Sequence, residues 1–248
     1  MVEQAFEGER QEKICTIIAD SVLNGLTKRC LGRAQELGYS YNFDWMGLPI
    51  IQYPQDIVAM QELVWAIKPD LIIETGIARG GSAIFYSSLL ELNAMCGGPQ
   101  DAQLVAVDID IRAANRAAIE AHPMAKRITM IQGSSIDWAI VEQVRHFAEG
   151  KARVLVCLDS NHTHDHVLEE LRAYAPLVTP GSYCVVFDTL VEYLPEAAIG
   201  SRPWCKGDNP MTAVRAFFQE NANFEIDPTR HGKLQVTVAP EGYLKRVR

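Results

Sequence analysis

The chain has 248 residues, 48% of them hydrophobic, and a formal net charge of −8 at pH 7. This is enough apolar material for one large α/β core, whereas the acidic balance excludes a broad nucleic-acid surface, which requires clustered lysines and arginines. No apolar run approaches the ~18 residues of a membrane span, and the polar N-terminus does not resemble a signal peptide. The six cysteines form no C-x-x-C pair. We therefore expect a cytoplasmic protein with free thiols that binds neither nucleic acid nor a membrane.

The first 40 residues are predicted to form one or two helices with a single apolar stripe. The stripe has helical spacing and consists of Ile14, Ile17, Ile18, Val22 and Leu26. It is most simply a cover for the core, and it also suits a lid or a contact between subunits, so we expect a homo-oligomer. An ordered, aromatic loop over 39–54 follows, then a helix over 57–67. We divide the chain into an N-terminal helical cover and loop, 1–55, and one globular domain, 56–248.

A repeated alternation of strands and helices comes next. The predicted strands cover 71–74, 103–108, 128–132, 153–159 and 182–188, and the helices between them cover 82–90, 111–121, 138–148 and 164–174. This alternation predicts an α/β fold with a Rossmann-like, doubly wound sheet that is mostly parallel. After an irregular stretch and a helix over 211–221, the segments 224–226 and 234–239 are predicted to close the sheet as an antiparallel pair.

The first predicted strand runs into a glycine-rich turn. Its sequence is Glu74-Thr75-Gly76-Ile77-Ala78-Arg79-Gly80-Gly81-Ser82, an E-x-G-x-x-x-G-G pattern that differs from the G-x-G-x-x-G of dinucleotide-binding folds. A strand, tight turn and helix start bring bare backbone close to a ligand at the carboxyl edge of the sheet. The acid before the first glycine repels phosphate but suits a cation, such as the amino or sulfonium end of S-adenosylmethionine. A turn without a ligand is the alternative.

Four acids end four of the predicted strands: Glu74, Asp108, Asp159 and Asp188. Because successive parallel strands end at one edge, these acids should converge on one crevice. At the second strand, Asp108 or its neighbour Asp110 is placed to accept hydrogen bonds from ribose hydroxyls. After the third strand, Ser135 either caps the next helix or contacts an adenine edge.

The last two acids suggest a metal site. Carboxylates at adjacent strand ends suit Mg²⁺, and Thr189 offers a hydroxyl, although both acids would also serve as caps. His162 follows Asp159 by three residues, where a neutral imidazole can act as general base. Two alternatives remain for this histidine: a zinc or iron pair with His166, one helical turn away, or an ordinary helix-start residue.

Seven segments between about residues 40 and 220 share the pattern of a known family. They are Trp45-x-Gly47-x-Pro49-Ile50-x-Gln52-x-Pro54-x-Asp56, Gln61-Glu62, the turn from Pro69 to Ala83, Asp108-Ile109-Asp110-Ile111, Asp159-Ser160-x-His162, Asp188-Thr189 and Asn209-Pro210-Met211-x-Ala213-Val214. On these segments the chain resembles the cephalosporin hydroxylase / rhamnosyl O-methyltransferase family, a branch of the class I S-adenosylmethionine-dependent methyltransferases.

The resemblance implies a Rossmann-like sheet with its last strand antiparallel, S-adenosylmethionine in the crevice and Mg²⁺ beside it. Carried over by position, His162 would be the base, where catechol-type methyltransferases use a lysine, and Asp159 and Asp188 would hold the metal, with Thr189 or water as a further oxygen ligand. Relatives often carry a further acid where this chain has Phe187. The cofactor-binding candidates are Glu74, Gly76, Gly80, Ser82, Asp108, Asp110, Ser135 and Asp159.

The expected function is a Mg²⁺-assisted O-methyltransferase acting on a hydroxylated small molecule, either a sugar or an antibiotic-type natural product. A nicotinamide oxidoreductase is disfavoured by the glycine spacing and by the absence of a Tyr-x-x-x-Lys pair. A non-catalytic accessory subunit that binds the cofactor is the other alternative. An iron(II) oxygenase would require a two-His, one-carboxylate triad, usually on a β-barrel. We expect the acceptor pocket to be built by residues 39–54 and 189–210.

Overall fold

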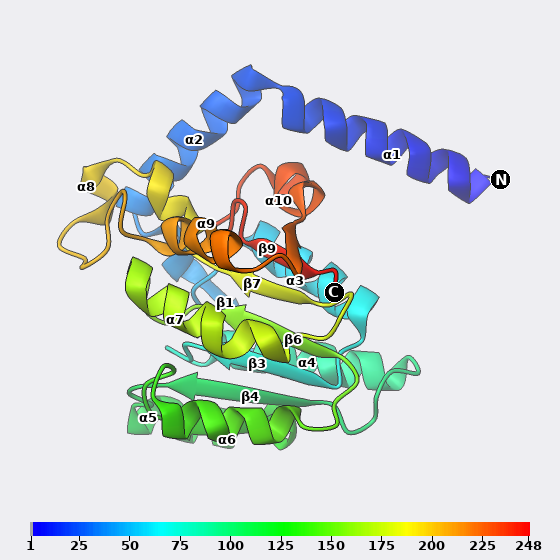
Figure 1. Cartoon of the computed structure of the whole chain (residues 1–248), viewed down its shortest axis with the longest axis vertical. Coiled ribbons are helices and arrows are strands. Elements are labelled where there is room, and N and C mark those ends of the chain that lie inside the picture. The colour runs from blue at the N-terminus through cyan, green and yellow to red at the C-terminus, as the bar shows by residue number, and fades with distance from the viewer. Residues whose placement is uncertain (1) are drawn as a thin grey trace.

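A computed structural model describes residues 2–248 and contains a central seven-stranded sheet (Figure 1). The strand order is β5-β4-β3-β6-β7-β9-β8. Strands β3 to β7 pair in parallel, whereas β9 is antiparallel to both β7 and β8. This confirms the predicted α/β fold with an antiparallel end. The strands are β3 (Leu71–Thr75), β4 (Gln103–Asp108), β5 (Ile128–Gln132), β6 (Val154–Leu158), β7 (Tyr183–Val186), β8 (Phe224–Ile226) and β9 (Tyr243–Arg246).

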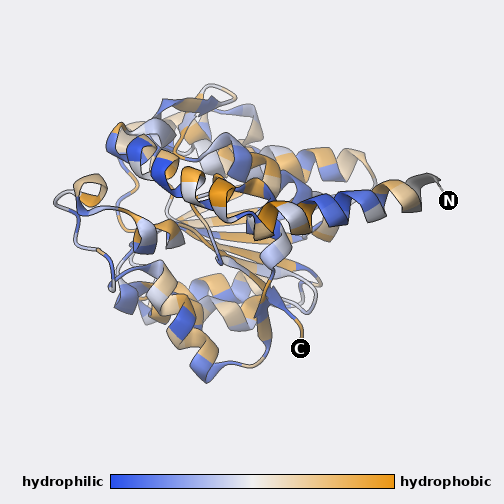
Figure 2. Cartoon of the chain, turned by 90° about the horizontal axis from the view of Figure 1, so that it is seen from above, coloured by the Kyte–Doolittle hydropathy of each residue, from blue (hydrophilic) through white to orange (hydrophobic). Residues whose placement is uncertain are grey.

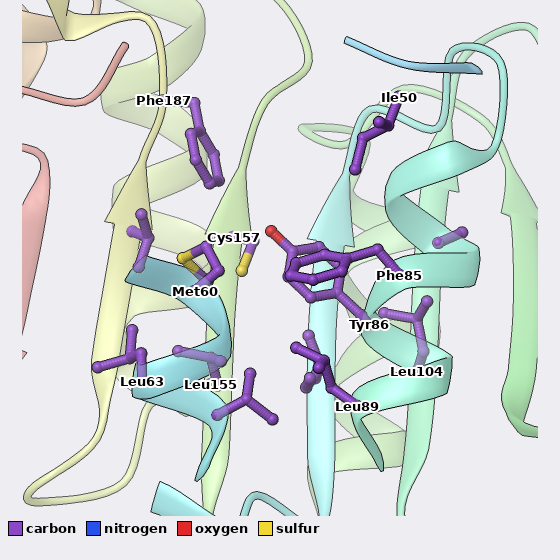
Figure 3. Packing of buried hydrophobic residues seen from close by; sticks show 14 of the residues in the cluster. Ile50, Met60, Leu63, Phe85, Tyr86, Leu89, Leu104, Leu155, Cys157 and Phe187 are labelled. Atoms are coloured by element: carbon purple, nitrogen blue, oxygen red, sulfur yellow. The ribbon is translucent and has the colours of Figure 1, made fainter. Parts of the chain in front are cut away.

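Helices cover both faces of the sheet because side chains alternate along each buried strand. On β6, Leu155 and Cys157 join the core cluster shown in Figure 3, while Val156 joins the cluster on the opposite face. The first face is covered by α3 (Pro54–Ile67), α4 (Gly81–Met95) and α5 (Ala113–Glu120), and the second by α6 (Trp138–Ala148), α7 (His164–Tyr174) and α9 (Pro210–Glu220). In Figure 2 the strands at the centre are hydrophobic and the outer helices are mixed.

The N-terminal helices lie across one end of the molecule, beside α8 (Glu196–Ile199) and α10 (Pro228–Leu234) (Figure 1). The chain breaks between α1 (Val2–Ala19) and α2 (Ser21–Glu36), because the Asp20 carboxylate accepts hydrogen bonds from the first amides of α2. The predicted continuous stripe is therefore wrong: Ile14 is buried, whereas Val22 and Leu26 are 72% and 50% exposed.

Of two regions outside the main alternation, one agrees with the prediction and one does not. The aromatic loop over 39–54 is ordered, as predicted, and contains the turn η1 (Tyr39–Asn42) and a hairpin of β1 (Phe43–Trp45) and β2 (Leu48–Ile50). The segment 234–239 is not a strand. Its Val238 amide and Thr237 hydroxyl donate to the buried Asp56 carboxylate instead of a neighbouring strand, and β9 takes the predicted place beside β8.

Short helical turns complete the chain: η2 (Pro123–Arg127), η3 (Ala175–Leu177) and η4 (Thr189–Tyr193). Within residues 2–248, no helix combines the length and the apolar character needed to cross a membrane. The turn η4 matters for the site because it begins directly after Asp188, at the carboxyl end of β7.

Candidate active site

The glycine turn after β3 is packed between the ends of its neighbouring strands. Gly76 has a left-handed φ of 93°, and a Cβ there would lie 2.1 Å from the carbonyl oxygen of Asp159. At Gly80, with φ 90°, a Cβ would lie 2.5 Å from Ile119. Both positions require glycine, because any side chain would push the turn away from the strand or helix that it contacts. The turn therefore holds the ends of β3 and β6 close together.

Asp108 is fixed by this turn, whereas Asp110 is not. One Asp108 carboxylate oxygen accepts hydrogen bonds from the amides of Ile77 at 2.8 Å and Ala78 at 3.1 Å. The other oxygen accepts from the Asp110 amide at 3.0 Å. The Asp110 side chain is 69% exposed and lies 3.6 Å from Arg112. The structure thus separates two residues that the sequence left equivalent, and it brings only Asp108 to the crevice.

Glu74 lies beneath the turn and is 2% exposed. Burial raises its pKa to about 8, with a smaller contribution from the charge of Asp108, while the Ser82 hydroxyl lowers it. One carboxylate oxygen of Glu74 is buried without a hydrogen-bond partner among the described residues. An unused acidic acceptor under a glycine turn fits a ligand that brings N–H donors or positive charge to this place.

Two adjoining cavities open at the carboxyl edge of the sheet. The first, of about 240 Å³, is lined by Asp159, His162 and Asp188, and we call it the carboxylate cavity. The second, of about 230 Å³, is lined by Asp108, Ser134 and Ser135, and we call it the serine cavity. Residues Ser160 and Trp204 line both. The crevice predicted from the strand-end acids is therefore divided into two parts.

The carboxylate cavity holds a cluster with the composition of a metal site. One ligand atom from each of Asp159, His162 and Asp188 lies within 4.8 Å of the other two. The Nε2 atom of His162 is 3.1 Å from the Asp188 carboxylate. The imidazole also packs edge-on against Trp204, with ring centroids 4.6 Å apart. Asp188 adopts a left-handed φ of 54°, a strained conformation that is common at functional sites.

The two carboxylates of this cluster repel each other. Burial raises the pKa of Asp159 well above its usual range, and the charges of Asp188 and Glu74 raise it further. A bound cation removes this penalty, because it favours the charged form of both acids. Two carboxylates at one edge of the sheet are oxygen donors that Mg²⁺ or a similar ion can use together with water, so the residues present fit a divalent metal.

Other predicted residues have different positions. The Thr189 side chain is buried, and its hydroxyl donates to the Pro240 carbonyl at 2.6 Å, so the structure does not bring it into the cluster. Ser135 does not cap α6, since Asp137 fills that role. Its hydroxyl lies 3.0 Å from Nε2 of His166, beside the serine cavity. His166 therefore belongs to this set of hydroxyls and is not part of the metal-like cluster with His162.

Three further residues of the carboxylate cavity come from the segments 39–54 and 189–210, which we expected to build the acceptor pocket. Gln52 donates a hydrogen bond from Nε2 to the Asp159 carboxylate at 3.0 Å. Arg202 and Tyr41 line the same cavity from the late loop and from η1. Gln52 lies in a segment that carries the family resemblance, which is a signal that could have singled it out. The position of Arg202 depends on how a long loop folds back, and its sequence offers no periodic pattern.

Phe187, the departure from the family pattern, is 2% exposed and belongs to the apolar cluster of Figure 3. Phe187 therefore offers no ligand atom to the cluster. Among the described residues, the third member of the cluster, beside Asp159 and Asp188, is His162.

The Rhamnosyl O-methyltransferase/CmcI family matches residues 37–247 of the chain. The chain belongs to this family. The Rhamnosyl O-methyltransferase of Mycobacterium leprae (strain TN) is 31% identical over 207 residues, which cover 82% of each chain. The protein of the same name from Mycobacterium bovis (strain BCG / Pasteur 1173P2) is 30% identical and is covered over 77% of its length. As a member of the Rhamnosyl O-methyltransferase/CmcI family, the chain is an S-adenosylmethionine-dependent O-methyltransferase, and the oxidoreductase and accessory-subunit alternatives are wrong.

Solved structures support the fold of this family member. The structure described as cmcI-D160 Mg-SAM has a TM-score of 0.59 at 18% identity and covers 84% of this chain and 78% of its own. The MycE methyltransferase from the mycinamycin pathway, solved with Mg and SAH, has a TM-score of 0.51 at 15% identity and covers 88% and 55%. At these identities the similarity establishes the methyltransferase fold.

Proposed function

We propose that the chain transfers the methyl group of S-adenosylmethionine to a hydroxyl of a sugar-bearing small molecule, with Mg²⁺ held by Asp159 and Asp188. The observation that carries the proposal is the cluster of Asp159, His162 and Asp188 beside the glycine turn, with ligand atoms within 4.8 Å. The printed names of the curated relatives, rhamnosyl O-methyltransferases, and the solved neighbours that bind Mg support the same assignment.

The cofactor would be held by the glycine turn and the serine cavity. The turn offers bare backbone at Gly76 and the unused oxygen of Glu74 for the methionine end. Asp108 has its carboxylate oriented by three amides and lines the serine cavity, where it can accept ribose hydroxyls. Ser135 would contact the adenine edge. Gly80 and Ser82 shape the turn, and Asp110 has no place in this assignment because its side chain points to solvent.

The metal would be held by Asp159 and Asp188, and Thr189 is omitted because its hydroxyl is engaged elsewhere. When bound, Mg²⁺ lowers the pKa of an acceptor hydroxyl and orients it. His162 would accept the acceptor's proton. A neutral His162 that donates its Nε2–H to Asp188, 3.1 Å away, keeps Nδ1 free to accept a proton, which is the arrangement of an oriented general base.

The remaining walls of the carboxylate cavity suit a sugar. Tyr41 and Trp204 offer aromatic surface for the apolar faces of a ring, and Arg202 offers N–H donors for its hydroxyls. Two guanidinium contacts already hold Arg202, since it donates to the carbonyls of Ala198 and Ile199. The other N–H groups of Arg202 are available to hydroxyls of the acceptor. The residues that would select the acceptor therefore lie on loops outside the sheet.

The test is methyl transfer from labelled S-adenosylmethionine to a panel of rhamnosyl and other glycosyl acceptors, with Mg²⁺ present and with the metal removed by a chelator. We expect transfer to a sugar hydroxyl that stops on chelation and returns when Mg²⁺ is added. Full activity after chelation would remove the metal from the account. Transfer only to acceptors without a sugar would overturn the acceptor class.

A further inference from the structure

Gln52 lies at the junction of β2 and α3 and is held firmly in place. Its side chain is 7% exposed, and the neighbouring Ile50 and Tyr53 are 1% and 0% exposed in the core. Gln52 also lines the carboxylate cavity. A long polar side chain buried between anchored neighbours, at the wall of a charged cavity, requires a physical reason, since burial of an amide is costly unless it is hydrogen-bonded.

The only hydrogen bond of this amide among the described residues goes to the carboxylate cluster. Nε2 donates to Oδ2 of Asp159 at 3.0 Å, whereas Oε1 is buried and has no partner. In this orientation an amide N–H group faces the carboxylate oxygen, whereas the reverse orientation would place the amide oxygen against it and leave two acceptors facing each other. Gln52 thus leaves one acceptor unsatisfied and uses its donor on Asp159.

The two acids of the cluster are supported differently. Asp188 contacts His162, which is itself part of the cluster, and its side chain is 29% exposed. Asp159 receives a side-chain hydrogen bond from Gln52, which comes from a segment more than 100 residues away in sequence. With Oδ2 occupied by an external donor, the carboxylate of Asp159 is fixed in rotation, and its other oxygen is left for a ligand.

We propose that Gln52 is a positioning residue that orients Asp159 for the divalent ion. This inference rests on the proposed metal function. Residues that hydrogen-bond a metal ligand fix its rotamer before the metal arrives, and their removal typically weakens metal binding by ~10–100-fold. Through Gln52, the segment that precedes the methyltransferase sheet sets the geometry of the cluster.

The test is Gln52→Leu, which keeps the approximate size of the side chain and removes only its polar atoms. The matched control is Gln61→Leu, the same change on the exposed side of α3. Both full-length variants are titrated with Mn²⁺, an ion that occupies Mg²⁺ sites, and binding is followed by electron paramagnetic resonance. Calorimetry with S-adenosylhomocysteine and thermal unfolding are measured on the same samples.

We expect Gln52→Leu to weaken Mn²⁺ binding by about tenfold or more, with an unchanged affinity for S-adenosylhomocysteine and an unchanged or higher melting temperature. The Mg²⁺ concentration for half-maximal activity should rise, while kcat at saturating Mg²⁺ recovers. Gln61→Leu should behave like the wild type. Equal Mn²⁺ affinity in Gln52→Leu and wild type would overturn this inference alone, whereas a wild type that binds no Mn²⁺ would overturn the metal proposal and this inference with it.

Discussion

The serine cavity and the carboxylate cavity share Ser160 and Trp204, yet their acids are held in opposite ways. In the serine cavity, the Asp108 carboxylate accepts hydrogen bonds from three backbone amides, and both of its oxygens have a partner. In the carboxylate cavity, Asp159 and Asp188 lie close enough to repel each other, and the pKa of Asp159 is raised. In the proposed assignment, the cofactor side is thus built in advance by main chain, whereas the two acids of the acceptor side need a cation to favour their charged forms.

The largest expected effect separates chemistry from binding in the carboxylate cavity. His162→Ala should slow methyl transfer by ~10²–10⁴-fold, the range for a lost general base. The affinities for S-adenosylhomocysteine and Mn²⁺ should change little, because Asp108, Asp159 and Asp188 remain. Single-turnover rates and calorimetry on the same variant measure both quantities. Near-normal turnover would assign proton removal to another group.

A smaller effect tests the main-chain support of the serine cavity. Asp108→Ala removes the acceptor of the Ile77 and Ala78 amides and should weaken S-adenosylhomocysteine binding by ~10–100-fold, since hydrogen bonds to a charged group contribute ~1.5–3 kcal/mol each. Asp110→Ala is the matched control, because that side chain is 69% exposed. Calorimetric titration of both variants measures the difference. Equal losses in the two would contradict the separation of these acids.

The smallest effect concerns Glu74, the buried acid near the end of β3. The folded-state pKa of Glu74, about 8, lies above its value in an unfolded chain, so the folded state binds more protons than the unfolded state between about pH 5 and 8. The ligand-free protein should therefore lose stability as pH rises through this window. Glu74→Gln should reduce that loss by about 2 kcal/mol between pH 6 and 8.

Urea unfolding of wild type and Glu74→Gln at both pH values measures this difference. The raised pKa of Asp56, about 7, stays the same in both proteins and cancels in the comparison. Parallel pH profiles for the two proteins would mean that Glu74 is ionised at neutral pH in the folded chain.

The sheet and the acids at its edge could be predicted from sequence because they depend on local patterns. The strand over 128–132 and the helices over 138–148 and 164–174 agree with β5, α6 and α7, whose apolar periodicity is clear. Glu74, Asp108, Asp159 and Asp188 end apolar runs, and parallel pairing brings such ends to one edge. For these elements, the local pattern of apolar and acidic residues agrees with the place that each element takes in the fold.

The rest depended on one helix cap and on long-range contacts that the apolar periodicity does not report. Asp20 ends one helix and caps the next, which divides the apolar stripe between two axes. The choice of β9 over residues 234–239 as the closing strand follows from the buried Asp56, which draws Val238 out of strand pairing. Gln52 and Asp159 meet only because the early loop packs on the sheet edge. The contacts of Asp56 with Val238 and of Gln52 with Asp159 join segments more than 100 residues apart.

The measurement that tests the central claim most directly is a crystal structure of the full chain with S-adenosylhomocysteine and Mn²⁺, using the anomalous signal of the metal. We expect a single metal peak in the carboxylate cavity, at coordination distance from the carboxylate oxygens of both Asp159 and Asp188, with the nucleoside in the serine cavity against Asp108. A fully occupied cofactor with no metal at saturating Mn²⁺, or a metal held by His166, would contradict it.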